Sequence, residues 1–159
     1  MKKLVLCLLC CLICLCGCAA APQAPEQTDG NLEQTEKDNK EGIKMHIQIG
    51  EHSFTATLED NAATRELVQM MQEKPVTIQM NDYAGFEKVG PLGKSLTTDN
   101  RQTTTSPGDI VLYNGDQIVM FYGANSWSYT RIGKVDDLSG WEKALGSGSI
   151  TAVFSLEAE

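Results

Sequence analysis

The feature that most constrains the fold is the stretch of residues 108–122, GDIVLYNGDQIVMFY, in which two apolar runs flank an Asn-Gly pair. Asn114 and Gly115 both tolerate the positive φ angles of a two-residue type I′ turn, so the pair predicts a β-hairpin. Counting outward pairs Leu112 with Gln117 and Ile110 with Val119. Because alternate residues of a strand share a face, we expect these core residues: Ile110, Leu112, Val119 and Phe121. The opposite face is more mixed and is expected to be partly covered.

The first 18 residues have the features of a secretion signal. Lys2 and Lys3 precede an uncharged apolar run that is shorter than the ~20 residues of a membrane-spanning helix. Leu15-Cys16-Gly17-Cys18 resembles the lipobox of bacterial lipoproteins, and this resemblance implies cleavage before Cys18 and acylation of its sulfur. An ordinary cleaved signal is the alternative. We therefore expect residues 1–17 to be removed and the protein to be lipid-anchored to the outside of the bacterial cell membrane.

The cysteines are confined to that signal. All six lie within the first 18 residues, at positions Cys7, Cys10, Cys11, Cys14, Cys16 and Cys18. The mature chain would keep only Cys18, which excludes a disulfide scaffold, a thiolate metal site and a cysteine nucleophile. The two histidines, His46 and His52, are expected on opposite faces of a hairpin. We therefore predict no metal site, and no cofactor is indicated.

The chain is acidic. Its formal net charge is −8, and removal of Lys2 and Lys3 would make it −10. A nucleic-acid interface needs a concentrated positive surface, so nucleic acid is excluded as a partner. Residues 18–42 are polar with Leu32 as the one large apolar residue, which predicts a disordered tether. The folded domain is expected over residues 43–157.

Local patterns predict the remaining elements of that domain. A hairpin forms around Gly50-Glu51 as a type II′ turn, and Asp60 or Asn61 caps a helix. Pro91, Gly93 and the polar run at 97–106 make residues 86–107 irregular, apart from a short strand near 86–89. The other expected elements are strands 43–49, 53–58, 76–80, 127–135 and 150–156, and helices 62–73 and 138–145. This count fits a closed antiparallel β-barrel with two short helices covering its openings.

Several segments resemble a known family. Ile132-Gly133-Lys134-Val135 is similar to the late FGKV segment of cyclophilins. NDYAGFEK, GDIVLY, SYTRIGKV and ALGSG, in this order, resemble the small bacterial cyclophilin-like proteins. The resemblance extends over most of the chain beyond the tether. It implies a mainly β, closed antiparallel cyclophilin-like barrel.

The resemblance bears on function less directly. Cyclophilins are peptidyl-prolyl isomerases, and the family implies an Arg on the strand after the first helix that hydrogen-bonds the twisted prolyl amide. Residues 76–81 read VTIQMN and contain no Arg. The isomerase signature is therefore absent from its expected strand. An isomerase that uses Arg131 or Arg101 instead is the alternative to a non-catalytic protein.

One group of residues has the chemistry of a ligand-binding surface. Trp127, Tyr129 and Arg131 share a face by their i, i+2, i+4 spacing. Aromatic rings can stack on a peptide or proline while a guanidinium donates to a carbonyl oxygen. The alternative is that these side chains only stabilise the barrel wall. We predict a non-catalytic module that binds a peptide, a protein segment or a small ligand through Tyr83, Phe121, Tyr122, Trp127, Tyr129 and Arg131.

Overall fold

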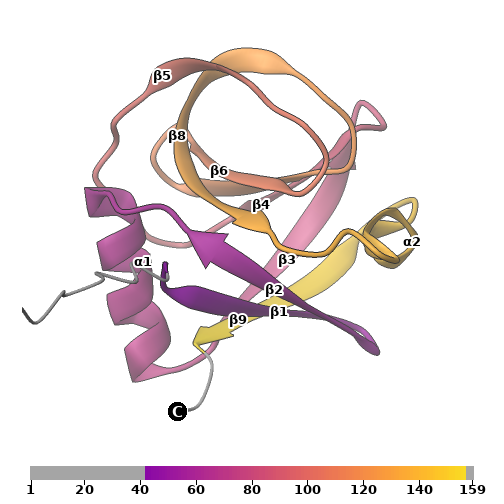
Figure 1. Ribbon diagram of the computed structural model, residues 1–159, viewed down its shortest axis with the longest axis horizontal. Helices are drawn as coiled ribbons and strands as arrows, with labels where there is room; N and C mark the ends of the chain where they lie inside the picture. Colours follow the sequence, from indigo (N-terminus) through magenta and orange to yellow (C-terminus); the bar gives the residue numbers. More distant parts are fainter. Residues whose placement is uncertain (1–41, 157–159) are drawn as a thin grey trace, which may run out of the picture. The chain divides into compact units, whose positions relative to one another are not determined.

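The computed structural model describes residues 42–156, which contain nine strands and two helices (Figure 1). The predicted signal, the tether up to residue 41, Cys18 and residue 157 lie outside the described residues. In chain order the elements are β1 (Lys44–Ile49), β2 (His52–Leu58), α1 (Ala62–Glu73), β3 (Val76–Tyr83), β4 (Glu87–Pro91), β5 (Arg101–Thr104), β6 (Asp109–Tyr113), β7 (Gln117–Phe121), β8 (Ser126–Val135), α2 (Trp141–Leu145) and β9 (Ile150–Leu156).

Eight of these strands form a closed antiparallel barrel. Their order is β2-β1-β9-β3-β4-β7-β6-β8, and β8 pairs with β2 to close the circle. Strand β5 stands outside the barrel and pairs with the first residues of β8. The predicted fold class, a mainly β closed antiparallel barrel with two short helices, is confirmed.

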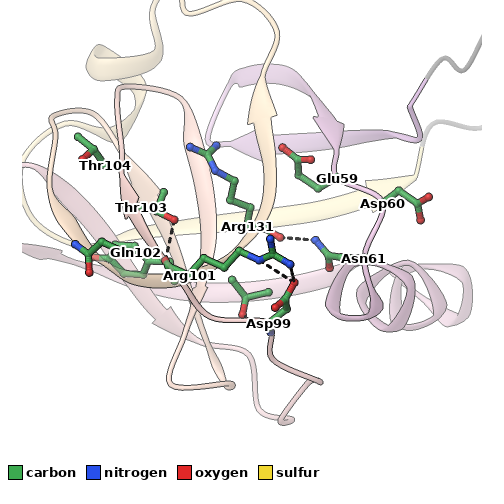
Figure 2. Close-up of a pocket in the computed structure, with 11 residues that line it drawn as sticks. Glu59, Asp60, Asn61, Asp99, Arg101, Gln102, Thr103, Thr104 and Arg131 are labelled. Carbon is green, nitrogen blue, oxygen red and sulfur yellow. Dashed lines mark hydrogen bonds and ion pairs between the residues drawn. The ribbon is translucent and has the colours of Figure 1, made fainter. Parts of the chain in front are cut away.

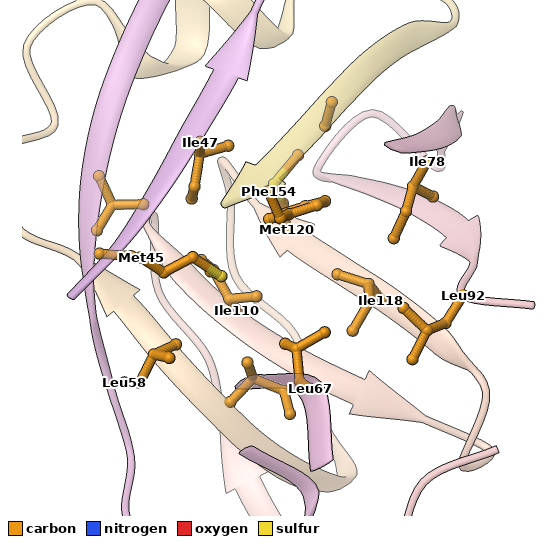
Figure 3. Close-up of a cluster of buried hydrophobic side chains, with 14 of the residues drawn as sticks. Met45, Ile47, Leu58, Leu67, Ile78, Leu92, Ile110, Ile118, Met120 and Phe154 are labelled. Atoms are coloured by element: carbon orange, nitrogen blue, oxygen red, sulfur yellow. The ribbon is translucent and has the colours of Figure 1, made fainter. Parts of the chain in front are cut away.

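The barrel is filled by apolar side chains that converge from most of its strands (Figure 3). Met45 and Ile47 of β1 meet Ile118 and Met120 of β7, all at most 1% exposed. Burial of such side chains contributes roughly 1.5–3 kcal/mol each. With no cysteine among residues 42–156, this core carries the stability of the domain.

The two helices lie on opposite sides of the barrel (Figure 1). Asn61 caps α1 by accepting the Thr64 N–H at 3.0 Å, as predicted, and its amide donates to the Arg131 carbonyl at 2.7 Å. Helix α2 begins at Trp141, three residues later than predicted, because Gly140 takes a positive φ of 81°. The buried Trp141 ring donates its N–H to the Phe121 carbonyl at 2.8 Å.

The first hairpin has the predicted register. Ile49 pairs with His52 across Gly50-Glu51, and Gly50 has the positive φ that the first position of a type II′ turn requires. Ile47 and Phe54 consequently face the core.

The register predicted for the central hairpin is wrong by one residue. Asn114 and Gly115 take the expected positive φ, yet the ladder starts with Tyr113 opposite Gln117, so Asp116 joins the loop. The Asp116 carbonyl accepts the Leu92 N–H at 2.8 Å, a tertiary contact that competes with strand pairing. A one-residue shift exchanges the faces of β7. Val119 and Phe121 therefore face outward, while Ile118 and Met120 fill the core with Ile110 and Leu112.

The segment predicted to be irregular contains more structure than expected. Strand β3 continues through Tyr83, β4 spans Glu87–Pro91, and β5 forms inside the polar run. Thr103 and Thr105 of that run are buried, and Thr105 exchanges hydrogen bonds with Asn125. Pairing with β8 thus orders a stretch that has no apolar alternation.

The closure of the barrel predicts the effect of one substitution. Gly133 of β8 lies against β2 so closely that an added Cβ would come within 2.5 Å of the Thr57 carbonyl oxygen. We expect Gly133→Ala to lower the free energy of unfolding by about 1–3 kcal/mol, measured by urea denaturation. Ser128→Ala, at an exposed position of the same strand, is the control. A Gly133→Ala protein as stable as the wild type would contradict this packing.

Candidate functional site

A second buried cluster lies on the outer face of the barrel wall. Its members are Val111, Val119, Phe121 and Tyr129, of which the first three alternate along β6 and β7 with residues of the core. The Phe121 and Tyr129 rings meet edge-on with their centroids 5.7 Å apart. Because the first half of β8 leaves the barrel to pair with β5, Tyr129 packs onto this outer face.

Beside this cluster is a cleft of about 430 Å³, which we call the aromatic cleft. Five strands and the Asn125 loop contribute its lining residues: Tyr83, Glu87, Val89, Tyr113, Gln117, Asn125, Trp127 and Tyr129. Tyr83 is 61% exposed and Trp127 is 57% exposed, whereas Tyr129 is 4% exposed. The cleft thus combines a buried apolar floor with two aromatic side chains that remain open to solvent.

Within residues 42–156, the lining of this cleft contains one carboxylic acid side chain, that of Glu87. It lies on β4 opposite Tyr83 of β3 and Phe121 of β7, and it is 6% exposed. Its Oε2 atom is buried without a hydrogen-bond partner. Burial raises the pKa of the Glu87 carboxyl to about 7, because a charged carboxylate is poorly solvated among apolar neighbours.

Hydrogen bonds hold the wall of the cleft in place. The Asn125 amide donates to the Tyr129 hydroxyl at 3.0 Å, and the Asn125 backbone N–H donates to the Thr105 hydroxyl at 3.0 Å. Burial, followed by the nearby Glu87 charge, raises the pKa of Tyr129. The phenol therefore stays neutral, and its ring is fixed as part of the floor.

Figure 2 shows a second hollow of about 510 Å³, which we call the polar cavity. It shares the lining residue Tyr129 with the aromatic cleft. It is lined by Glu59, Asp60, Asn61, Asp99, Arg101, Gln102, Thr103, Thr104, Tyr129, Thr130 and Arg131. Arg101 bonds Asp99 through two nitrogens, at 2.9 and 3.2 Å. Figure 2 shows the Arg131 guanidinium extending away from this pair, and Arg131 lies 3.7 Å from the buried Asp109. The cavity's two arginines therefore already have carboxylate partners.

Tyr122 belongs to a different cluster. Its hydroxyl donates to Asp82, which also accepts the buried Lys88 ammonium at 2.8 Å. Lys88 makes a further bond to the Gly148 carbonyl at 2.8 Å. Burial, with the bond to Asp82, raises the pKa of Tyr122 to about 12. This network connects β3, β4 and the residue after β7 to the segment between α2 and β9.

The structure brings together three of the six predicted binding residues. Tyr83, Trp127 and Tyr129 line the aromatic cleft, and Phe121 lies under its floor. Arg131 lines the polar cavity, and Tyr122 lines neither. Five residues that line the cleft were not predicted from the sequence: Glu87, Val89, Tyr113, Gln117 and Asn125. Glu87 and Val89 share one face of their strand by their i, i+2 spacing, and this was the signal that could have identified them. The spacing did not show which strands would cover that face.

The fold and the cleft define a small cyclophilin-type barrel with a hollowed outer wall. The model of the cyclophilin-like family matches residues 47–155, and the chain belongs to this family. A hypothetical protein from Archaeoglobus fulgidus, known from its solution structure, superposes with a TM-score of 0.55 over 74% of this chain and 96% of its own. At 13% identity that likeness shows a shared fold. No curated protein matches the chain in sequence.

Residues 42–156 contain neither a helix that could span a membrane nor a cluster of side chains for a metal ion. Neither helix in this part of the chain has the length and hydropathy to cross a membrane. The same residues hold no group of three or more His, Cys, Asp or Glu side chains placed to bind a metal ion.

The buried Glu87 predicts a pH-dependent stability difference. The pKa of the Glu87 carboxyl is about 7 in the folded protein, against an ordinary value of 4.5. As the pH rises from 4.5 to 7, ionisation of this carboxyl therefore increasingly favours the unfolded chain. We expect Glu87→Gln to raise the free energy of unfolding on the order of 3 kcal/mol at pH 8, and to have almost no effect at pH 4.5.

Urea denaturation of both proteins across this pH range measures the difference. Glu59→Gln, at an exposed acidic position, is the matched control and should show no such trend. A Glu87→Gln effect that is constant with pH would mean that the carboxyl is solvated normally.

Proposed function

We propose that this chain is a non-catalytic binding module whose aromatic cleft takes a peptide, a protein segment or a small ligand. The observation that supports this most directly is the exposure of Tyr83 and Trp127 above a floor that is already buried and apolar. Among residues 42–156 the other exposed large apolar side chains are Ile43 and Leu138. Two of the four exposed large apolar side chains in this part of the chain therefore border one cleft, and such a concentration is typical of a binding surface.

An extended ligand would use both hollows. Tyr129 borders the aromatic cleft on one side and the polar cavity on the other. A segment that crosses Tyr129 could stack on Trp127 and reach the half-exposed Arg131, whose ion pair with Asp109 is long at 3.7 Å. In this arrangement the predicted aromatic and guanidinium groups contact one ligand from adjacent hollows.

The isomerase alternative needs a cation beside the prolyl amide. Among the described residues the aromatic cleft is lined by neither Arg nor Lys, and its charged group is the Glu87 carboxylate. Arg101 and Arg131, the substitutes considered from the sequence, line the polar cavity. The chemistry of the cleft therefore favours binding over isomerisation.

We further propose that the module is displayed outside the cytoplasm by a lipid on Cys18. The proposal rests on the basic start, the short apolar run and the lipobox-like Leu15-Cys16-Gly17-Cys18. The acidic charge of the chain would repel an anionic membrane surface, so attachment would rest on the acyl chains.

The binding proposal is tested with the two exposed aromatic residues. We expect Trp127→Ala and Tyr83→Ala each to weaken binding of peptides selected from a random array by about ten-fold, because each removes a ring that stacks on the ligand. Leu138→Ala, an exposed apolar position outside the cleft, should bind as the wild type does. Fluorescence anisotropy of labelled peptides measures affinity, and circular dichroism checks the fold.

If all three variants bind the peptides equally well, the ligand binds outside the aromatic cleft. A failure of the array to yield any ligand would contradict peptide recognition. Acceleration of a proline-limited refolding reaction by the wild type, lost in Arg131→Ala, would instead support the isomerase.

Membrane attachment has its own test. We expect Cys18→Ser to abolish incorporation of labelled palmitate and to move the protein from the detergent phase to the aqueous phase in phase partitioning. Cys16→Ser, two residues away, is the matched control and should stay in the detergent phase. A Cys18→Ser protein that still incorporates palmitate would rule out acylation at this residue.

A further inference from the structure

The aromatic cleft has an unusual combination of groups for a site that would take only apolar ligands. Its rings come from Tyr83, Tyr113, Trp127 and Tyr129, and a carboxyl group, that of Glu87, lies among them. Aromatic faces carry negative electrostatic potential and attract cations. A carboxylate within the same apolar enclosure adds a full negative charge whose field is weakly screened.

The Glu87 carboxyl is also incomplete as a hydrogen-bonding group. Its Oε2 atom is buried and has no partner among the described residues. Buried carboxylate oxygens are almost always hydrogen-bonded, since an unpaired one loses its solvation without compensation. Lys88, the adjacent residue on β4, does not supply the missing donor, because its ammonium bonds Asp82 and Gly148. Because Glu87 lines the cleft, a ligand seated there can supply a donor to this carboxyl.

We propose that the aromatic cleft binds an alkylammonium group, with Glu87 as its counter-ion and the surrounding aromatic rings as its walls. This inference rests on the proposed binding function and names the chemistry that the site selects. An alkylammonium fits both features, since its N–H groups can donate to the carboxylate while its methylene chain packs on the rings. The group could belong to a lysine side chain of a bound segment or to a small amine.

The proposal fixes the direction of a pH effect. The titratable groups that line the cleft with Glu87 are the phenols of Tyr83 on β3, Tyr113 on β6 and Tyr129 on β8, and Tyr122 follows β7. Between pH 6 and pH 8 the Glu87 carboxyl passes through its raised pKa of about 7 and changes charge. An alkylammonium binds the ionised carboxylate, and its own charge is constant in this range. Affinity should rise by roughly nine-fold from pH 6 to pH 8, as the ionised fraction of Glu87 rises from about 0.1 to about 0.9.

Tryptophan fluorescence of the full chain in a non-ionic detergent tests the proposal. The chain has two tryptophans, Trp127 in the cleft and the buried Trp141, so Trp127→Phe identifies the responding residue. The probes are Nα-acetyl-lysine methylamide, n-butylammonium, and Nα-acetyl-norleucine methylamide, which is the lysine probe without its ammonium group. We expect the two amines to change the Trp127 emission saturably, and the norleucine probe to bind at least about ten-fold more weakly.

Two variants separate charge from shape. Glu87→Gln keeps the size of the side chain and should weaken amine binding by about ten-fold or more. Glu51→Gln, at an exposed turn position that lines neither hollow, should leave amine binding within about two-fold. Tighter binding of the lysine probe than of n-butylammonium assigns the site to a peptide side chain, and equal binding assigns it to a small amine.

Three results would overturn the proposal. The first is equal affinity for the norleucine probe and the lysine probe. The second is an affinity for amines that is unchanged in Glu87→Gln, and the third is an affinity for amines that falls as the pH rises. None of these results would affect the binding of other peptides, so the proposed function is tested separately by the peptide array. Absence of amine binding with intact peptide binding would overturn this inference alone.

Discussion

The structure depends on strand β8, whose two halves pair with different strands. Its second half pairs with β2 and β6 and closes the barrel at Gly133, where the lack of a side chain allows the backbones to approach. Its first half leaves the barrel and pairs with β5. The β6–β8 ladder shifts register between Ile110 and Val111, and an irregularity of this kind bends and twists a strand, which is consistent with this change of partner. Without this change, Trp127 and Tyr129 would have no position above the outer wall.

The same wall therefore has two apolar faces. Along β6 and β7, one set of alternate residues fills the barrel and the other set lies in or beneath the floor of the aromatic cleft. An outer face of a small barrel is ordinarily polar, because water covers it. Here the packing of Tyr129 onto the outer face and the burial of Glu87 make a region outside the barrel that is shielded from solvent. This is the physical basis of the proposed site, since a charge in such a region keeps its field and lacks solvent partners.

Elements with strong local signals were predicted to within a residue or two. The Asn61 cap and Pro75 delimit α1, Gly50 sets the first turn, and the β-rich run at residues 150–156 is β9. The central register could not be obtained locally, because the Asp116 carbonyl bonds Leu92, more than twenty positions earlier in the chain. Strand β5 was missed because its polar residues pair only with β8. For the site, exposed aromatic residues were recognisable by type, whereas the burial of Glu87 arises from strands distant in sequence.

The division between the floor and the rim of the cleft also governs how such a protein can change over generations. Residues beneath the floor, such as Val119 and Phe121, lie in strands whose neighbouring positions fill the barrel, so replacing them endangers folding itself. Tyr83 and Trp127 project from the surface and make few contacts that the barrel needs. Substitutions at the rim are consequently free to accumulate. If the rim binds a ligand as proposed, related chains can share one scaffold and differ in what they recognise through a handful of outward-pointing positions.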